Sequence, residues 1–356
     1  MRILAIILLQ LMIAGPTFGQ TNNRQKPLVG AYYFGGWTAG SKHITQKLTG
    51  SFADRKPVWG WNSDSKKAID QQILAASDAG LDFFSFCWYF STQKSGEADS
   101  LNAALRYFQE SVNKSKLRYC LLVSNHYGFE ISPDSWAVFQ ERILADIKQD
   151  NYLQVDGAPL LIFLSAGTLL KNFGSAESIK SALSSLREAA KGRGLPGLKI
   201  ALCSSDDRYT LSLAGQCGFD FITGYNYHNI NQAGRRTQPV NNLVAYETRT
   251  WERITQLSEI PYFPAVTLNW DPRPWTNSRA KADTTAYFTG FSANSVYESM
   301  KNCRTWLRKH ANDGKVYPII MIYAWNELGE GSYLVPTSDG HDRLKSLKRS
   351  LNVNVR

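Results

Sequence analysis

RYCLLVSNHYGFEISPDSWAVFQERILADIKQDNYLQVDGAPLLIFLS, residues 118–165, contains one complete strand–helix–strand unit. Its two ends, 118–124 and 159–165, are short apolar runs rich in Leu, Ile and Val, which is typical of buried strands. The middle part, 135–149, has apolar residues at helical spacing, and a Pro-Asp pair directly precedes it, as at many helix starts. Two buried strands joined by a helix indicate parallel pairing.

The same rhythm extends along the chain in both directions. Strand-like runs occupy residues 28–34, 81–86, 118–124, 159–165, 198–204, 219–225, 262–268 and 316–324. Helical patterns occupy 66–79, 98–113, 135–149, 175–191, 242–257, 294–311 and 340–350, with room for only a turn or two near 210–214. Eight such units predict an α/β fold, a single (β/α)8 TIM barrel over residues 21–356. Long loops are expected after strands 1, 6 and 7, at 35–65, 225–241 and 269–293.

Composition excludes some classes of function and leaves others open. The 356 residues include 40 Lys and Arg against 30 Asp and Glu, a net charge of +10. Because the basic residues are scattered rather than gathered in one stripe, we expect no nucleic-acid partner. Aromatic residues make up 12% of the chain, with 10 Trp, 17 Tyr and 17 Phe. Such rings stack on sugars or fill a large core, and composition leaves both uses open.

The first 20 residues, MRILAIILLQLMIAGPTFGQ, have the pattern of a secretory signal peptide. One Arg precedes an apolar run over 3–14, and a Pro and a small Gly follow that run. The run is shorter than the roughly 20 residues that a membrane-spanning helix needs, and no later stretch is long enough. We expect an exported protein, periplasmic or extracellular, with no integral membrane segment.

The five cysteines are odd in number and contain no Cys-x-x-Cys pair, which disfavours the usual zinc sites. Three lie in apolar strand-like runs, where a free cysteine behaves as a small buried hydrophobe. Whether Cys203 and Cys217 pair is left open by the sequence. No cofactor motif is present, and a Gly-x-Gly-x-x-Gly turn is missing after the first strand, so we expect no cofactor and no metal.

Residues directly after each barrel strand meet at one rim, where barrel enzymes have their active sites. Here those residues are mostly rings, amides and histidines. We therefore predict that fifteen of them bind substrate: Tyr32, Tyr33, Trp37, Trp88, Tyr89, Asn125, His126, Tyr225, Tyr227, His228, Asn269, Trp270, Asp271, Trp325 and Asn326. Any single ring could instead cap the barrel core. The Asp206-Asp207 pair is more simply explained as a turn than as a second carboxylate site.

The segment WNELGEG, residues 325–331, gives the most specific chemical signal. Glu327 and Glu330 follow the last strand directly and are three residues apart. Glycosidases use two carboxyl groups, one of which protonates the leaving oxygen. The apolar neighbours Trp325 and Leu328 would raise the pKa of such an acid by removing water. A solvated pair of Glu side chains at a helix start would have the same spacing, so spacing alone leaves both explanations open.

WNELGEG followed by SYLVP, residues 325–336, resembles the WNEW-x-EG…LEP signature of glycoside hydrolase family 99 and of the related WbsX-like proteins, many of which are labelled glycosyltransferases. GAYYFGGW at 30–37, FFSFCWYF at 83–90 and LNWDPRPW at 268–275 are similar to other segments of that group. The resemblance extends over roughly residues 28–336. Leu328 stands where the signature has its second Trp, and Val335 stands where it has Glu.

The resemblance implies a retaining α-glycosidase with a (β/α)8 fold. Glu327 would be the base that acts on the 2-hydroxyl of the sugar, whose oxygen then displaces the leaving group. Glu330 would protonate the glycosidic oxygen and later activate water. The expected function is hydrolysis of an α-linked oligosaccharide or polysaccharide, such as an α-mannan. Whether the cleaved bond lies inside the glycan or at its end is left open. A WbsX-like glycosyltransferase of surface polysaccharide synthesis and a sugar-binding barrel without turnover are the alternatives, and the oligomeric state is left open.

Overall fold

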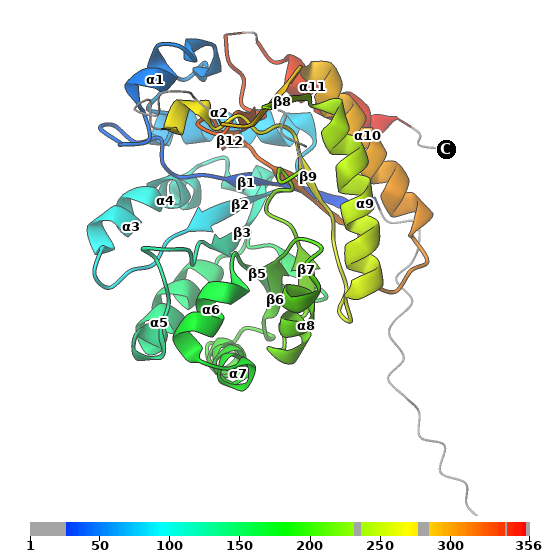
Figure 1. The fold of residues 1–356 in the computed structure, drawn as a ribbon. Coiled ribbons are helices and arrows are strands. Elements are labelled where there is room, and N and C mark those ends of the chain that lie inside the picture. Colours follow the sequence, from blue (N-terminus) through cyan, green and yellow to red (C-terminus); the bar gives the residue numbers. More distant parts are fainter. Residues whose placement is uncertain (1–25, 231–235, 277–284, 339, 354–356) are drawn as a thin grey trace, which may run out of the picture.

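A parallel barrel forms the centre of the molecule in the computed structural model, which describes residues 26–230, 236–276, 285–338 and 340–353 (Figure 1). Its eight strands are β1 (Leu28–Tyr33), β2 (Phe83–Trp88), β3 (Arg118–Val123), β5 (Ala158–Phe163), β6 (Lys199–Cys203), β7 (Phe221–Thr223), β9 (Ala265–Thr267) and β11 (Ile319–Tyr323). They neighbour one another in the order β7-β6-β5-β3-β2-β1-β11-β9, and all seven pairings in this order are parallel.

The barrel closes between β7 and the residues just before β9. Ile222 and Tyr262 form a parallel bridge there. The Ile222 amide donates to the carbonyl of Pro261 at 2.8 Å, and the Phe263 amide donates to the carbonyl of Ile222 at 3.0 Å. The predicted (β/α)8 barrel is therefore confirmed, with its eight strands in the predicted segments.

Helices cover the outside of the barrel (Figure 1). They are α2 (Lys66–Ala79), α3 (Ser95–Leu101), α4 (Ala103–Glu110), α5 (Trp136–Ile147), α6 (Ala166–Phe173), α7 (Ala176–Gly192), α8 (Arg208–Gln216), α9 (Asn241–Leu257), α10 (Ala293–Lys309) and α11 (Asp342–Asn352), and a short α1 (Gln46–Thr49) lies in the first loop. The helix between β6 and β7 is longer than the sequence indicated. The Asp207 side chain caps it by accepting from the Thr210 amide at 2.8 Å, so this aspartate forms a helix start as the turn interpretation expected.

The three predicted long loops follow β1, β7 and β9, and they form small elements of their own. The last two loops pair with each other through β8 (Thr237–Pro239) and β10 (Tyr287–Thr289). Directly after β11, β12 (Asn326–Glu327) and β13 (Ser332–Tyr333) form an antiparallel hairpin, which contains WNELGEG. A further short strand, β4 (Gln154–Val155), pairs antiparallel with β5.

The structure answers the question about the cysteines that the sequence left open. All five cysteines are buried and free, so Cys203 and Cys217 are not paired. The expected signal peptide, residues 1–20, lies outside the described residues. Across the segments that the structure describes, no helix is both long and apolar enough to span a membrane.

Candidate functional site

A cavity of about 390 Å³ lies at the rim where the barrel strands end, and both glutamates of the β12–β13 hairpin line it. Residues that closely follow β1, β2, β3, β5 and β7 line it as well, together with Trp275 from the loop after β9. A volume of this size is typical of small-molecule sites. Gly331 has a φ of 71°, a left-handed conformation that suits glycine, and it follows Glu330 directly in the hairpin turn.

Glu327 is buried, and only one of its carboxylate oxygens has a partner. The Tyr225 hydroxyl donates to Oε1 at 2.9 Å. Oε2 is buried and has no hydrogen bond to any described residue. Removal from water raises the pKa of Glu327 to about 7, while the bond from Tyr225 lowers it. An unpaired buried oxygen of this kind is costly unless a ligand contacts it.

Glu330 is partly exposed and lines the same cavity. Removal from water raises its pKa to about 8. This carboxyl group therefore keeps its proton near neutral pH, which is the state that a general acid requires. The sequence predicts that the apolar neighbours Trp325 and Leu328 raise the pKa of such an acid. The pKa of Glu330 is shifted in that direction.

Two aromatic clusters face the cavity. Tyr89, His126 and Phe129 contact one another with ring centroids 5.0–5.9 Å apart. Phe34, His43 and Trp275 form the second cluster, also with centroids 5.0–5.9 Å apart. All six line the cavity. Aromatic faces of this kind are suited to the apolar faces of sugar rings.

Trp275 packs directly on the turn between the two glutamates. A Cβ atom at Gly329 would lie 1.9 Å from the Trp275 ring, so only glycine leaves room for this contact. The Trp275 indole nitrogen donates to the carbonyl of His43 at 3.0 Å, which fixes the ring. Close packing of a ring against the backbone restrains the hairpin that holds both carboxyl groups.

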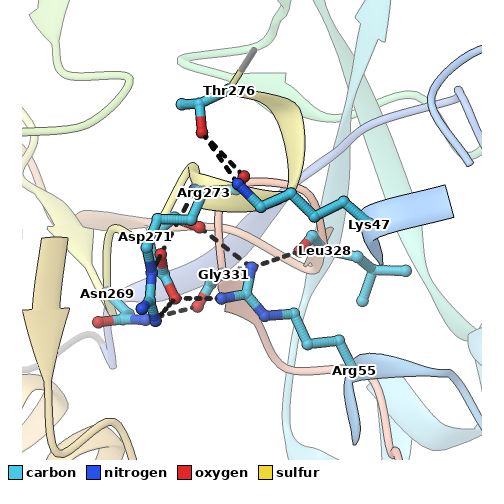
Figure 2. Close-up of polar contacts among 8 residues, drawn as sticks. All are labelled: Lys47, Arg55, Asn269, Asp271, Arg273, Thr276, Leu328 and Gly331. Carbon is cyan, nitrogen blue, oxygen red and sulfur yellow. Dashed lines mark hydrogen bonds and ion pairs between the residues drawn. The ribbon is translucent and has the colours of Figure 1, made fainter. Parts of the chain in front are cut away.

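A buried ion pair also holds the hairpin (Figure 2). Arg55, from the loop after β1, pairs with the carboxylate of Asp271 and donates to the carbonyl of Leu328 at 2.9 Å. The Asp271 amide donates to the carbonyl of Glu330 at 2.6 Å. Arg273 donates to both oxygens of Asp271, at 2.7 and 2.8 Å. Asp271 thus supports the hairpin through its amide and through Arg55, and it is not among the residues lining the cavity.

Five of the seventeen predicted site residues line the cavity: Tyr89, His126, Tyr225, Glu327 and Glu330. Ten others are buried and do not line it: Tyr32, Tyr33, Trp37, Trp88, Asn125, Tyr227, Asn269, Asp271, Trp325 and Asn326. The remaining two, His228 and Trp270, are partly exposed and stack on each other with centroids 3.6 Å apart, also away from the cavity lining. The sequence placed these residues near the correct rim but could not show which way they point.

The buried group has structural partners that explain its position. Asn326 accepts from the Phe34 amide at 2.7 Å and donates to the Phe34 carbonyl at 2.8 Å, so it joins the hairpin to the end of β1. The Trp37 indole nitrogen donates to the carbonyl of Asn326 at 2.9 Å. Trp325 donates to Gln72 of α2 at 2.8 Å. These side chains fix the framework beneath the cavity.

Eleven of the sixteen lining residues were not selected from the sequence, among them the rings Phe34, His43, Phe129 and Trp275. Phe34 and Trp275 lie inside the segments GAYYFGGW and LNWDPRPW, so their positions in those segments were a usable signal. His43 comes from the long first loop, where no periodicity indicates which residue turns inward. Phe129 lies three residues after His126, on the turn that brings both rings together.

One of the two cavity histidines, His126, forms a hydrogen bond through its ring. The His126 Nδ1 lies 3.0 Å from the carbonyl of Tyr127. Because a carbonyl can only accept, Nδ1 bears the proton in this contact and Nε2 is an acceptor in the neutral ring. In the described part of the chain, no three His, Cys, Asp or Glu side chains are grouped as metal ligands would be.

A family model described as "Glycosyltransferase WbsX" matches residues 60–346 of this chain. The chain belongs to the WbsX family. This agrees with the resemblance carried by WNELGEG and the three other segments. No curated protein matches the chain in sequence.

Solved structures show which barrels this WbsX-family chain is similar to. A protein described as a "glycoside hydrolase-like protein" has a TM-score of 0.66 and 17% identity, covering 96% of this chain and 98% of its own. The GH99 endo-alpha-mannosidase from Bacteroides thetaiotaomicron has a TM-score of 0.60 and 15% identity, covering 91% of this chain and 95% of its own. The fold is thus that of glycoside hydrolase barrels.

Proposed function

We propose that this protein is an exported glycoside hydrolase that cleaves α-linked glycans with retention of configuration, using Glu327 and Glu330. One observation carries the proposal. Glu327 has a buried, unpaired carboxylate oxygen in the same ring-lined cavity that contains the partly exposed Glu330. A sugar hydroxyl would supply the missing partner, and the rings would bind the sugar faces.

In the first step, Glu330 gives its proton to the glycosidic oxygen as the bond from that oxygen to C1 breaks. Glu327 takes the proton of the 2-hydroxyl, and that oxygen forms the new bond to C1. The product is a 1,2-anhydro sugar with a free leaving alcohol. Tyr225 keeps Oε1 of Glu327 engaged at 2.9 Å, so Oε2 is the oxygen left for the substrate.

In the second step the roles reverse. Glu330, now ionised, takes a proton from water as the water oxygen bonds to C1. The bond from C1 to the 2-oxygen breaks, and Glu327 returns its proton to that oxygen. Two displacements at the same carbon give net retention, as in other retaining glycosidases.

The proposed roles define a working pH range. Glu327 must be ionised, and its pKa is raised to about 7. Glu330 must be protonated, and its pKa is raised to about 8. Below the first value the base is protonated, and above the second value the acid is ionised, so kcat/KM should be bell-shaped with its maximum between them.

A reducing-end assay tests the proposal. The purified chain is incubated with a panel of α- and β-linked oligosaccharides and polysaccharides, without any nucleotide sugar. Release of reducing ends from an α-linked substrate, lost in Glu330→Gln and kept in the exposed control Glu188→Gln, is expected. Transfer that requires a nucleotide sugar would instead support the activity in the family's description, and saturable binding without turnover would support a sugar-binding barrel.

A further inference from the structure

The cavity mouth contains charged side chains that the proposed chemistry does not use. Lys42, Lys94 and Glu97 all line the cavity. Lys42 comes from the loop after β1, and Glu97 from α3, which follows β2. The Lys42 ammonium donates to Glu97 at 2.5 Å. These two charges therefore compensate each other, and Glu97 holds a reduced pKa chiefly because of this bond.

Lys94 has no such partner. Its ammonium forms no hydrogen bond or ion pair with any of the residues that the structure describes. The ammonium lies 5.9 Å from the centroid of the Phe129 ring, another cavity residue. A Cβ atom at Gly128 would lie 3.1 Å from it. The side chain thus lies along the turn after β3, beside the cavity.

The position of Lys94 depends on that turn. Gly128 has a φ of 91°, a conformation that disfavours residues with a side chain, and its missing Cβ leaves space for the ammonium. Tyr127, one residue earlier, lines the cavity and is 87% exposed. An unpaired cation and an exposed aromatic ring therefore both line the cavity.

Lys42 and Glu97 compensate each other, so Lys94 is the cation that remains among the lining side chains. When the whole cavity lining is counted, the ionised Glu327 of the proposed mechanism balances this charge. The whole chain carries a net charge of +10, so its long-range field has the same sign as Lys94. Glu330, which also lines the cavity, is neutral near pH 7 because removal from water raises its pKa to about 8.

We propose that the glycan bound by this cavity carries an anionic group, a uronate carboxylate or a sulfate ester, that pairs with Lys94 while its sugar ring lies against Phe129 and Tyr127. The ammonium group has three N–H donors on a flexible side chain, so it can donate hydrogen bonds to either anion. This inference rests on the proposed function for the statement that the bound glycan is hydrolysed. The binding of an anionic glycan does not depend on hydrolysis.

Binding measurements with matched polymers test the anionic subsite. Glu330→Gln in the full chain is titrated with polygalacturonate and its methyl ester, and with dextran sulfate and dextran. The members of each pair differ in charge, and the two pairs separate carboxylate from sulfate. We expect the charged member of one pair to bind about three- to tenfold more tightly, with the difference reduced by salt.

Variants in the same background identify the group responsible. Lys94→Met should abolish the preference for the charged polymer, and Lys94→Arg should keep it. Lys67→Met removes the same charge from the exposed side of α2 and should change nothing. Equal binding of charged and neutral polymers, or equal losses in Lys94→Met and Lys67→Met, would overturn the proposal.

Failure of this subsite and failure of the hydrolase are distinguishable. If a charged α-linked polymer is hydrolysed equally fast by the unmodified chain and by Lys94→Met, and is bound equally well by both, the hydrolase stands and the anionic subsite is wrong. If no polymer is hydrolysed but the preference for charge disappears with Lys94→Met, the subsite stands and the hydrolase is wrong.

Discussion

The hydroxyl of Tyr225 donates a hydrogen bond to Oε1 of Glu327 at 2.9 Å, and the other carboxylate oxygen has no partner among the described residues. Tyr225 follows β7, whereas Glu327 follows β11, so the barrel brings together two residues that are far apart in the sequence. The bond fixes one oxygen of the carboxylate and leaves the other for a ligand.

Replacing Tyr225 by Phe should shift the acidic limb of the pH profile. The hydrogen bond from Tyr225 stabilises the ionised form of Glu327. Without it, the pKa of Glu327 should rise by about one unit. At pH 7 the ionised fraction of the base falls from about one half to about one tenth, so kcat/KM should fall about fivefold. Tyr227→Phe is the matched control, because the Tyr227 hydroxyl contacts that of Tyr262 at 3.0 Å and is not in the cavity lining. An unmoved acidic limb in Tyr225→Phe would contradict the role of Glu327 as base.

Gly329→Ala should displace Trp275. The added methyl group would overlap the ring, and relieving such overlap typically costs about 1–3 kcal/mol. We expect a large fall in kcat with the chain still folded, and a changed tryptophan fluorescence. Gly314→Ala, where an added Cβ meets nothing within 4 Å, provides the control. Full activity in Gly329→Ala would show that the Trp275 contact does not position the glutamates.

Arg55→Met should destabilise the protein. Arg55 is buried, and its removal leaves the Leu328 carbonyl without this donor. Among the described residues, Asp271 would keep only Arg273 as a cationic partner. We expect the free energy of unfolding to fall by about 3 kcal/mol, measured from urea denaturation. Arg193→Met, which removes a pair with the exposed Glu141, should cost less than about 1 kcal/mol. Equal effects of the two substitutions would contradict the structural role of Arg55.

Glu247 on α9 should make stability depend on pH. It is buried, and loss of water raises its pKa to about 8. Since an unfolded Glu has a pKa of about 4.3, the folded state holds a proton that the unfolded state releases between these values. The free energy of unfolding should therefore fall as pH rises from about 4.3 to about 8.

Glu247→Gln tests this, because glutamine cannot ionise but can still accept from the Thr267 amide. Relative to the unmodified chain, the variant should gain on the order of 3 kcal/mol between pH 5 and pH 8. Urea midpoints at the two pH values measure the difference, and Glu188→Gln should show no such gain. The same relative stability at both values would mean that Glu247 is ionised in the folded state.

The barrel could be predicted from the sequence because each strand is a short apolar run and nearly every connection contains a helix with a clear apolar period. The α8 helix was underestimated because its apolar pattern is weak, and the cap from Asp207 depends on local geometry. Helix α6 was missed because it lies close to α7, with only Gly174 and Ser175 between them.

The site could be predicted only in part. WNELGEG placed both glutamates correctly because they follow the last strand directly, where all barrel strands end together. The direction of a ring at a strand end was not predictable, since it depends on partners from distant segments. Trp37, for example, is buried and does not line the cavity, and its indole donates to the carbonyl of Asn326, 289 residues later.

The configuration of the newly released sugar tests the central claim most directly. Proton NMR, recorded within the first minutes after the chain is mixed with an α-linked substrate that it hydrolyses, detects the anomer formed before mutarotation. The account predicts that the α-anomer appears first, and that Glu330→Gln forms it far more slowly. First appearance of the β-anomer would contradict the retaining mechanism assigned to Glu327 and Glu330.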